Sequence, residues 1–231
     1  MLNQKLDKDV QLVLRDAADS LGMVRFDRSR NPPRNQYDVV HTYEFVGSGI
    51  YGGQKATKAT IGVDFGIVAI RADLETAPDK REITVASGQL SWDETVPGQF
   101  AKVGGTSAAD RLRLTWILPQ AVIHAAVKAP EKVKSTTVNG RKQLSVTLAD
   151  GTEVRGLMNE RNVMTRVEMQ VGGKTYVGEY DDFRSDVQDM EVMFPYKLVQ
   201  KVDGQVVTDL AITEHYANPY VIFPVPKELR R

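Results

Sequence analysis

Two segments, LSVTLADG (residues 144–151) and VMTRVEMQVGG (residues 163–173), carry the clearest fold signal in the chain. In both, apolar side chains occupy every second position, as in a β-strand that buries one face. Each segment ends in a pair of turn residues, Asp150-Gly151 or Gly172-Gly173, and such pairs favour hairpins. Because short hairpins join antiparallel neighbours, the segments predict strands within an antiparallel series over residues 134–216.

The same alternation continues on both sides of these segments. Residues 57–72 (TKATIGVDFGIVAIRA) predict one long strand, and residues 206–212 predict another. Glycines on the outer face of 57–72, at positions 62 and 66, indicate a bent or closely approached strand. The side chains expected on the buried face of 57–72 are Ile61, Val63, Phe65, Ile67 and Ala69.

Two regions have the period of a helix instead. Apolar residues three and four apart predict a helix over 6–22, which Gly22 would end, followed by a loop over 25–35. A second helical region is expected over 107–128, with Ser107 and Asp110 as a capping pair and Pro119 at the start of a second helix. The run after Pro119 is apolar nearly all round, as in a helix enclosed by a sheet.

These patterns predict a mainly β (α+β) fold, a curved antiparallel half-barrel sheet wrapped around a few helices. We expect a single domain over 1–231, with an N-terminal helix and loop over 1–36 and a C-terminal tail or linker over 219–231. The composition is that of an ordinary globular chain, with 42% hydrophobic and 26% charged residues. Its 30 basic and 30 acidic residues balance, which gives no support to a nucleic-acid partner, and no stretch approaches the length of a membrane span.

No catalytic or metal-binding motif is found in the sequence. The chain has no cysteine, and its three histidines, His41, His124 and His215, lie far apart, so we expect no metal site and no cofactor. Gly47, Gly49 and Gly52 match G-x-G-x-x-G, but a strand rather than a helix is expected after them, so a hairpin loop is the better interpretation.

The inward face of the predicted sheet is large and apolar. It is either plain core or the wall of a cavity of a few hundred Å³ for an apolar ligand. The residues expected to line such a cavity are Phe65, Ile67, Trp116, Ile123, Val146, Val167, Met169 and Leu210. Polar groups that could lie inside it are Tyr43, Glu44, Arg113 and His124.

Several stretches resemble the LolA/LolB-like lipoprotein-carrier fold. The similarity is greatest to the N-terminal domain that precedes the catalytic domain of certain secreted metallo-β-lactamase-fold hydrolases. The segments that carry this resemblance are LMNERNVMTRVE (157–168), RLRLTWILPQAVIHAAV (111–127), GEYDDF (178–183) with Phe194-Pro195, QVVTDLAITEHYAN (205–218), and SWDE (91–94) with Pro97-Gly98. One departure is Gln120, where these relatives tend to carry a histidine after the proline.

The resemblance implies an open half-barrel around helices that binds acyl chains or other apolar ligands in its concavity, in the periplasm or outside the cell. The H-x-H-x-D-H metal motif of the hydrolases is absent from these residues, so the resemblance does not extend to their activity. The polar N-terminal residues 1–9 do not form a signal peptide.

Three functions remain open on the sequence. The chain binds an acyl chain or another apolar small molecule without catalysis; or it is a non-catalytic accessory or dimerisation domain, with itself or a metallo-β-lactamase-fold domain as partner; or it is a cofactor-independent enzyme that uses the same cavity. The first is the expectation that the apolar inward face favours.

Overall fold

The computed structural model describes residues 7–27, 29, 34–36, 40–185 and 191–230. In chain order the helices and strands are α1 (Lys8–Ser20), β1 (Arg25–Asp27), β2 (Arg34–Gln36), β3 (Thr42–Tyr51), β4 (Gln54–Asp64), β5 (Ala69–Ala77), β6 (Lys80–Ser87), β7 (Leu90–Val96), β8 (Gln99–Val103), α2 (Ala108–Trp116), α3 (Pro119–Lys128), the 3-10 turn η2 (Pro130–Lys132), β9 (Val133–Val138), β10 (Arg141–Thr147), β11 (Glu153–Met158), β12 (Met164–Val171), β13 (Lys174–Ser185), β14 (Met193–Val202), β15 (Gln205–Ala217) and the 3-10 turn η3 (Lys227–Leu229).

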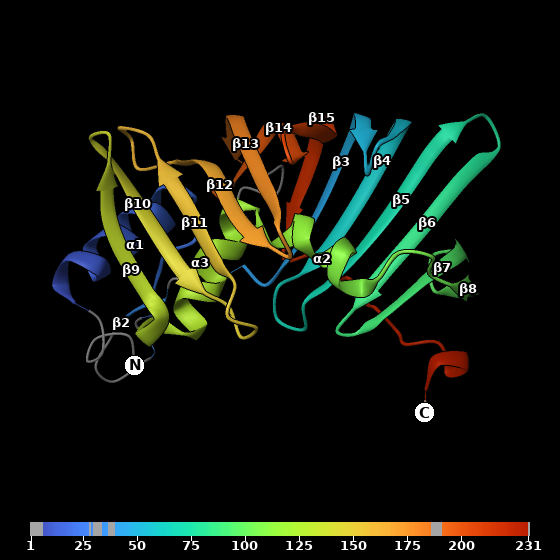
Figure 1. The fold of residues 1–231 in the computed structure, drawn as a ribbon, viewed down its shortest axis with the longest axis horizontal. Helices are drawn as coiled ribbons and strands as arrows, with labels where there is room; N and C mark the ends of the chain where they lie inside the picture. Colours follow the sequence, from blue (N-terminus) through green and yellow to red (C-terminus); the bar gives the residue numbers. More distant parts are fainter. Residues whose placement is uncertain (1–6, 28, 30–33, 37–39, 186–190, 231) are drawn as a thin grey trace.

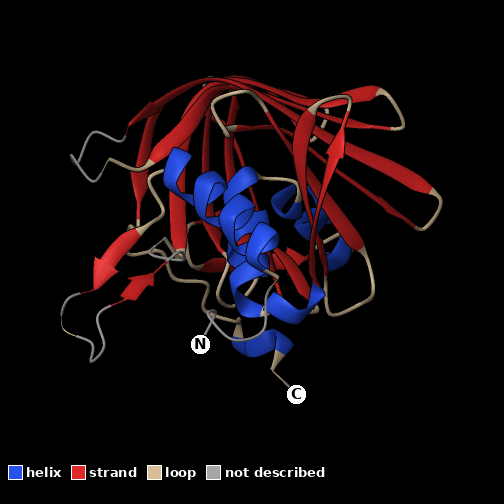
Figure 2. Ribbon diagram, turned by 90° about the vertical axis from the view of Figure 1, so that its left-hand side faces the viewer, coloured by secondary structure: helices blue, strands red, loops and turns tan. Residues whose placement is uncertain are grey.

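Thirteen strands form one antiparallel sheet, in the order β8-β7-β6-β5-β4-β3-β15-β14-β13-β12-β11-β10-β9. Neighbours in the sheet are neighbours in the chain except at one place, where β15 pairs with β3. The sheet is therefore two meanders joined side by side, and it stays open because β8 and β9 form separate edges. It arches over α2 and α3 (Figure 1), and a view along the arch shows the helices on its concave side (Figure 2). The predicted fold class is confirmed.

The helices begin where the capping signals predict. Ser107 accepts a hydrogen bond from the backbone N–H of Asp110 at the start of α2, and Pro119 is the first residue of α3. Residues 119–126 of α3 are buried on every side, as the apolar run predicts. The predicted N-terminal helix is α1, and Gly22 follows it with φ +67°, a conformation that favours glycine. The loop predicted over 25–35 is wrong at its ends, because β1 and β2 pair with each other there.

The single long strand predicted over 57–72 is wrong. The chain turns at residues 65–68 and returns as β5, so 57–72 is the end of one strand, a hairpin and the start of the next. The Asp64 carboxylate accepts hydrogen bonds from the N–H groups of Gly66 and Ile67, and Val68 adopts φ +55°. Apolar residues happen to alternate through this turn as well, so the sequence pattern alone does not reveal it.

Two separate apolar cores lie on opposite faces of the sheet. The larger one fills the concave side between the sheet, α1, α2 and α3. The smaller one lies on the convex side of β5–β7, around Trp92, Ile83 and Val85, and Phe223 of the C-terminal segment completes it. The sheet thus packs apolar side chains on both of its faces across β5 and β6.

Candidate ligand site

A small apolar cavity lies between helix α2 and the concave face of β3, β4, β5 and β14. Its free volume is about 10 Å³, which is close to the space that one water molecule needs. The residues that line it are Phe45, Tyr51, Ile61, Val63, Ile70, Leu114, Thr115, Leu118, Leu198 and Gln200. The wall is therefore hydrocarbon with three polar groups in it.

Thr115 is the unusual member of this wall. It lies on the buried face of α2 together with Ala108 and Leu112, and only 2% of its surface is exposed. Within the described part of the chain, its hydroxyl has no hydrogen-bond partner. A buried hydroxyl without a partner costs about 1–3 kcal/mol relative to a satisfied one, so Thr115 keeps a polar group in an apolar cavity at a cost in stability.

Two further polar side chains in this region hold the end of α2. Gln200 of β14 donates from Nε2 to the carbonyl oxygen of Leu114 at 2.9 Å, and the Tyr180 hydroxyl donates to the carbonyl oxygen of Ile117 at 2.5 Å. These carbonyls belong to the last turn of α2 and the residue after it, where the helix cannot supply partners of its own. Burial raises the pKa of the Tyr180 phenol, against the lowering effect of Gln200, so the group stays protonated and able to donate.

Tyr51, the last residue of β3, also lines the cavity. Burial raises the pKa of its phenol, and the charge of Arg111 opposes this in part. It too stays a neutral hydroxyl at ordinary pH. The polar groups at the cavity are therefore all uncharged, which suits a hydroxyl, carbonyl or neutral carboxylic acid group of a ligand.

The residues predicted to line a ligand cavity lie elsewhere. Ile123, Val146, Val167 and Met169 pack around α3, where the concave side is filled, and Leu210 and Phe65 are buried in the same core. Trp116 is partly buried against that core. None of these lines the cavity under α2.

The predicted position of Ile67 is wrong. Its side chain is 56% exposed, because it lies in the turn between β4 and β5 rather than on the inner face of a strand.

The four polar candidates are not gathered at one point. Tyr43 and Glu44 are consecutive in β3 and so point to opposite faces of the sheet. Tyr43 and His124 each contact the ring of Phe65, with ring centroids 6.3 and 5.9 Å apart. Arg113 lies on the other helix, bound to Asp110 and to the Tyr176 hydroxyl.

The glycine pattern at residues 47–52 has a structural explanation. It spans the end of β3 and the turn into β4, so a strand follows it, as expected. A Cβ at Gly47 would lie 2.5 Å from a carbonyl oxygen of β15, and a Cβ at Gly49 would lie closer still to another. These glycines therefore let two strands approach each other.

The described residues contain no group of three or more side chains that could hold a metal ion, and none of their helices is long and apolar enough to cross a bilayer. A wider hollow, about 450 Å³, lies at the β5–β6 hairpin, but its lining is mostly charged and includes Glu75, Asp79, Lys80 and Arg81. It does not fit an apolar ligand, so the space under α2 remains the candidate.

Sequence reasoning missed Thr115, although a signal for it was present. Thr115 lies three residues after Leu112 and seven after Ala108, which places a lone polar residue on the apolar stripe of a predicted helix. The strand residues of the cavity had no such signal, because only the pairing of β3, β4, β5 and β14 brings them together.

No protein-family model matches the chain, and no curated protein matches it. Solved structures that are similar to it include the following two. One is a LolA superfamily protein from Nitrosomonas europaea, with 13% sequence identity and a TM-score of 0.45, over 95% of this chain and 96% of that chain. The other is a putative outer membrane lipoprotein-sorting protein domain from Vibrio parahaemolyticus, with 9% identity and a TM-score of 0.40, over 92% and 95% of the two chains.

Proposed function

We propose that the chain binds an acyl chain or another apolar small molecule, without catalysis, between the concave face of the sheet and helix α2. The observation that carries this proposal is the cavity under α2, where an apolar wall surrounds the buried, unpartnered hydroxyl of Thr115 in the described structure. An apolar ligand with one neutral polar group would supply both the apolar contact and the missing hydrogen bond.

A ligand larger than water requires α2 to move. The helix has nine residues, and polar contacts hold it at both ends: Arg111 near its start, and Gln200 and Tyr180 at its end. Displacing it would join the cavity to the space that Leu112, Leu114 and Thr115 now fill. Each methylene that a ligand then buried would contribute about 0.8 kcal/mol, so a chain of several methylenes could offset the free energy needed to separate α2 from the sheet.

Binding rather than catalysis is favoured because none of the four polar candidates lines the cavity. Glu44 and Tyr43 lie on opposite faces of β3, and Arg113 is bound to Asp110 and Tyr176. The groups at the cavity itself are neutral hydroxyls and an amide, and a general acid or base that works near neutral pH needs a pKa close to that range.

The test combines extraction with a binding assay. An organic-solvent extract of the purified protein is analysed by mass spectrometry, and binding of palmitic acid and of a fluorescent naphthylamine probe is then titrated. Leu114→Trp would fill the cavity from α2, and Leu12→Trp adds the same side chain at a 45% exposed position of α1 as the matched control.

We expect Leu114→Trp to weaken binding about tenfold, equivalent to about 1.4 kcal/mol, and Leu12→Trp to leave it unchanged. Equal binding by a folded Leu114→Trp variant would contradict the proposed site. A wild-type protein that carries no extractable ligand and binds neither probe would contradict the function.

A second candidate, an accessory or dimerisation domain, is favoured by a different observation. The concavity is nearly filled, and apolar side chains are exposed at the sheet edge, with Val96 47% and Val103 64% exposed. Native mass spectrometry of the protein alone, and after mixing with a metallo-β-lactamase-fold domain, tests it. A monomer that ignores that domain would count against this candidate.

We also propose a periplasmic or secreted location. The support is the LolA/LolB-like resemblance of segments such as 157–168 and 205–218. Fractionation of cells that produce the full-length natural protein, followed by immunoblotting, would test it, and recovery in the cytoplasmic fraction alone would contradict it.

A further inference from the structure

The C-terminal segment, residues 219–230, is fixed to the convex face of the sheet. Val221 and Phe223 pack on the small convex core that contains Trp92. A Cβ at Gly62 of β4 would lie 3.2 Å from Val221 Cγ1, so the glycine on the outer face lets the segment lie close to the sheet. The neighbouring side chains, Tyr220 and Ile222, are 92% and 53% exposed.

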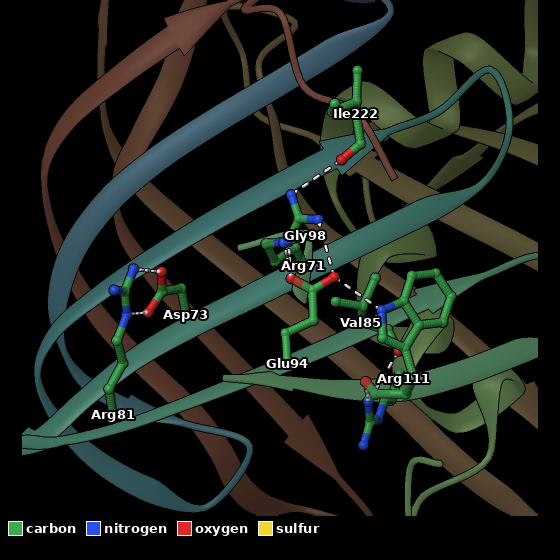
Figure 3. Close-up of polar contacts among 9 residues, drawn as sticks. Arg71, Asp73, Arg81, Val85, Glu94, Gly98, Arg111 and Ile222 are labelled. Atoms are coloured by element: carbon green, nitrogen blue, oxygen red, sulfur yellow. Dashed lines mark hydrogen bonds and ion pairs between the residues drawn. The ribbon is translucent and has the colours of Figure 1, made fainter. Parts of the chain in front are cut away.

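Arg71 of β5 binds this segment at two points. Its Nη1 donates to the carbonyl oxygen of Ile222 at 3.1 Å, and its guanidinium lies over the Phe223 ring, 5.4 Å from the centroid. Its Nε and Nη2 donate to the Glu94 carboxylate of β7, at 3.0 and 3.3 Å (Figure 3). The segment is thus linked through one arginine to strand β7.

Glu94 is buried, and both of its carboxylate oxygens accept hydrogen bonds. Its side chain is 1% exposed, and besides Arg71 it accepts hydrogen bonds from the Trp92 indole N–H at 2.9 Å and from the Gly98 backbone N–H at 2.8 Å. A buried carboxylate needs this full set of donors, so the position of β7 depends on the network on the convex face.

The same short stretch of β7 holds helix α2 on the opposite face. Arg111 of α2 donates from Nη1 to the carbonyl oxygens of Trp92 and Val85, at 2.9 and 3.0 Å, and from Nη2 to the Asp93 carboxylate at 2.8 Å. A Cβ at Gly104 would lie 2.9 Å from Arg111 Nη2, so glycine leaves room for the guanidinium. Residues 92–94 therefore bind the C-terminal segment on one side and α2 on the other.

The sheet holds β7 by a regular ladder on its β6 side, where Ile83 pairs with Glu94, but only weakly on its outer side. Beyond β7 lies only the five-residue edge strand β8, and the pairing of β7 with β8 is irregular on both sides of Glu94. Side-chain contacts on the two faces add the constraint that a regular ladder on the β8 side would provide.

We propose that the C-terminal segment acts as a clamp that holds α2 in place through Arg71, Glu94 and Arg111. Releasing the segment loosens β7, weakens the Arg111 contacts and frees α2 from the sheet. Because α2 covers the candidate ligand site, the segment would also control entry of a ligand. That consequence rests on the proposed function, whereas the link from segment to helix does not.

Hydrogen–deuterium exchange of the full-length protein, without ligand, tests the link. Phe223→Ala removes the main apolar anchor of the segment and changes neither Arg71 nor Glu94. The matched control is Asp73→Asn, which breaks the Arg81–Asp73 pair on the same face of β5 and β6, a pair that is drawn apart from the Arg71–Glu94 contacts in Figure 3 and is exposed on its arginine side. Peptides over 108–116 report on α2, and peptides over 119–128 serve as the internal reference.

We expect Phe223→Ala to speed exchange in 219–230 and in 108–116, the latter by about tenfold, with 119–128 unchanged. Asp73→Asn should leave 108–116 as in the wild type. If Phe223→Ala does not release the segment, Val221→Asp with Phe223→Ala removes both anchors and is measured in the same way. Fast exchange in 219–230 with unchanged exchange in 108–116 would overturn the clamp. The ligand site would then still be judged by its own binding assay, so the two failures are distinguishable.

Discussion

Replacing Thr115 by valine isolates the cost of the hydroxyl in the cavity under α2. Valine has nearly the same shape as threonine and a similar helix propensity, so the change substitutes a methyl group for the hydroxyl and little else. Thr115 is 2% exposed, and in the described structure its Oγ1 has no partner. The substitution therefore removes a buried polar group without breaking a hydrogen bond.

The expected effect is a gain in stability. An unsatisfied buried hydroxyl costs about 1–3 kcal/mol, and we take the lower end of this range. Thr115→Val should raise the free energy of unfolding by about 1 kcal/mol. For a chain of 231 residues this corresponds to a rise in Tm of about 2–4 °C.

Urea denaturation followed by tryptophan fluorescence measures the change, and Thr42→Val is the matched control. The Thr42 hydroxyl donates to the carbonyl oxygen of Pro219 at 2.9 Å, so the same substitution there removes a hydrogen bond and should lower stability by about 1 kcal/mol. The two variants are expected to shift the midpoint in opposite directions.

A loss of stability in Thr115→Val would refute this reasoning. It would mean that the hydroxyl is satisfied in solution, and a water molecule in the cavity is the natural partner because about 10 Å³ is just enough to hold one. In that case Thr115 would no longer mark a place for a polar group of a ligand.

Two further predictions concern stability. The hydrogen bond and charge of Lys201 and the charge of Arg166 lower the pKa of Glu179 below its ordinary value of 4.5, against the effect of its partial burial. The interaction of Glu179 with Lys201 and Arg166 stabilises the fold above pH 4.5, and this stabilisation is lost as the pH falls through the lower pKa of the folded state. Glu179→Gln should therefore flatten that part of a curve of unfolding free energy against pH. An unchanged curve would contradict the pairing. Gly22→Ala should lower the free energy of unfolding by at least about 2 kcal/mol, because φ is +67° and the new Cβ would overlap the Glu191 carbonyl oxygen; a midpoint in urea within error of the wild type would show that this approach is not close in solution.

Local sequence signals were sufficient to predict those features whose structure depends on one short segment alone. The capping pair Ser107 and Asp110, Pro119 at the start of α3 and the turn pair Gly172-Gly173 all appear in the structure where the sequence places them. Each acts through backbone groups within a few residues, so a single sequence contains the whole cause.

Alternation was less reliable wherever a turn or a bulge interrupts a strand. On the stretch from 163 to 171, the pattern puts Val163 on the inner face, yet Met164 is buried and Val163 is not. The register shifts by one residue between Leu157 and Met158 of the neighbouring strand, and Gly156 leaves the space that the Met164 side chain fills. A shift of one residue moves a side chain to the other face of a sheet.

The sequence by itself thus determined the class of fold, the two central helices and the absence of cysteine chemistry, because composition and short-range periodicity contain that information. Only the tertiary structure decided where the free space lies. The cavity joins residues of α2 with residues of β3, β4, β5 and β14, and β14 meets β3 only through β15, across more than 140 positions of sequence. Likewise, residues 219–230 contact one face of the sheet at β7, and Arg111 binds β7 from the other side. No pattern along the chain predicts which side chains come into contact through such an arrangement.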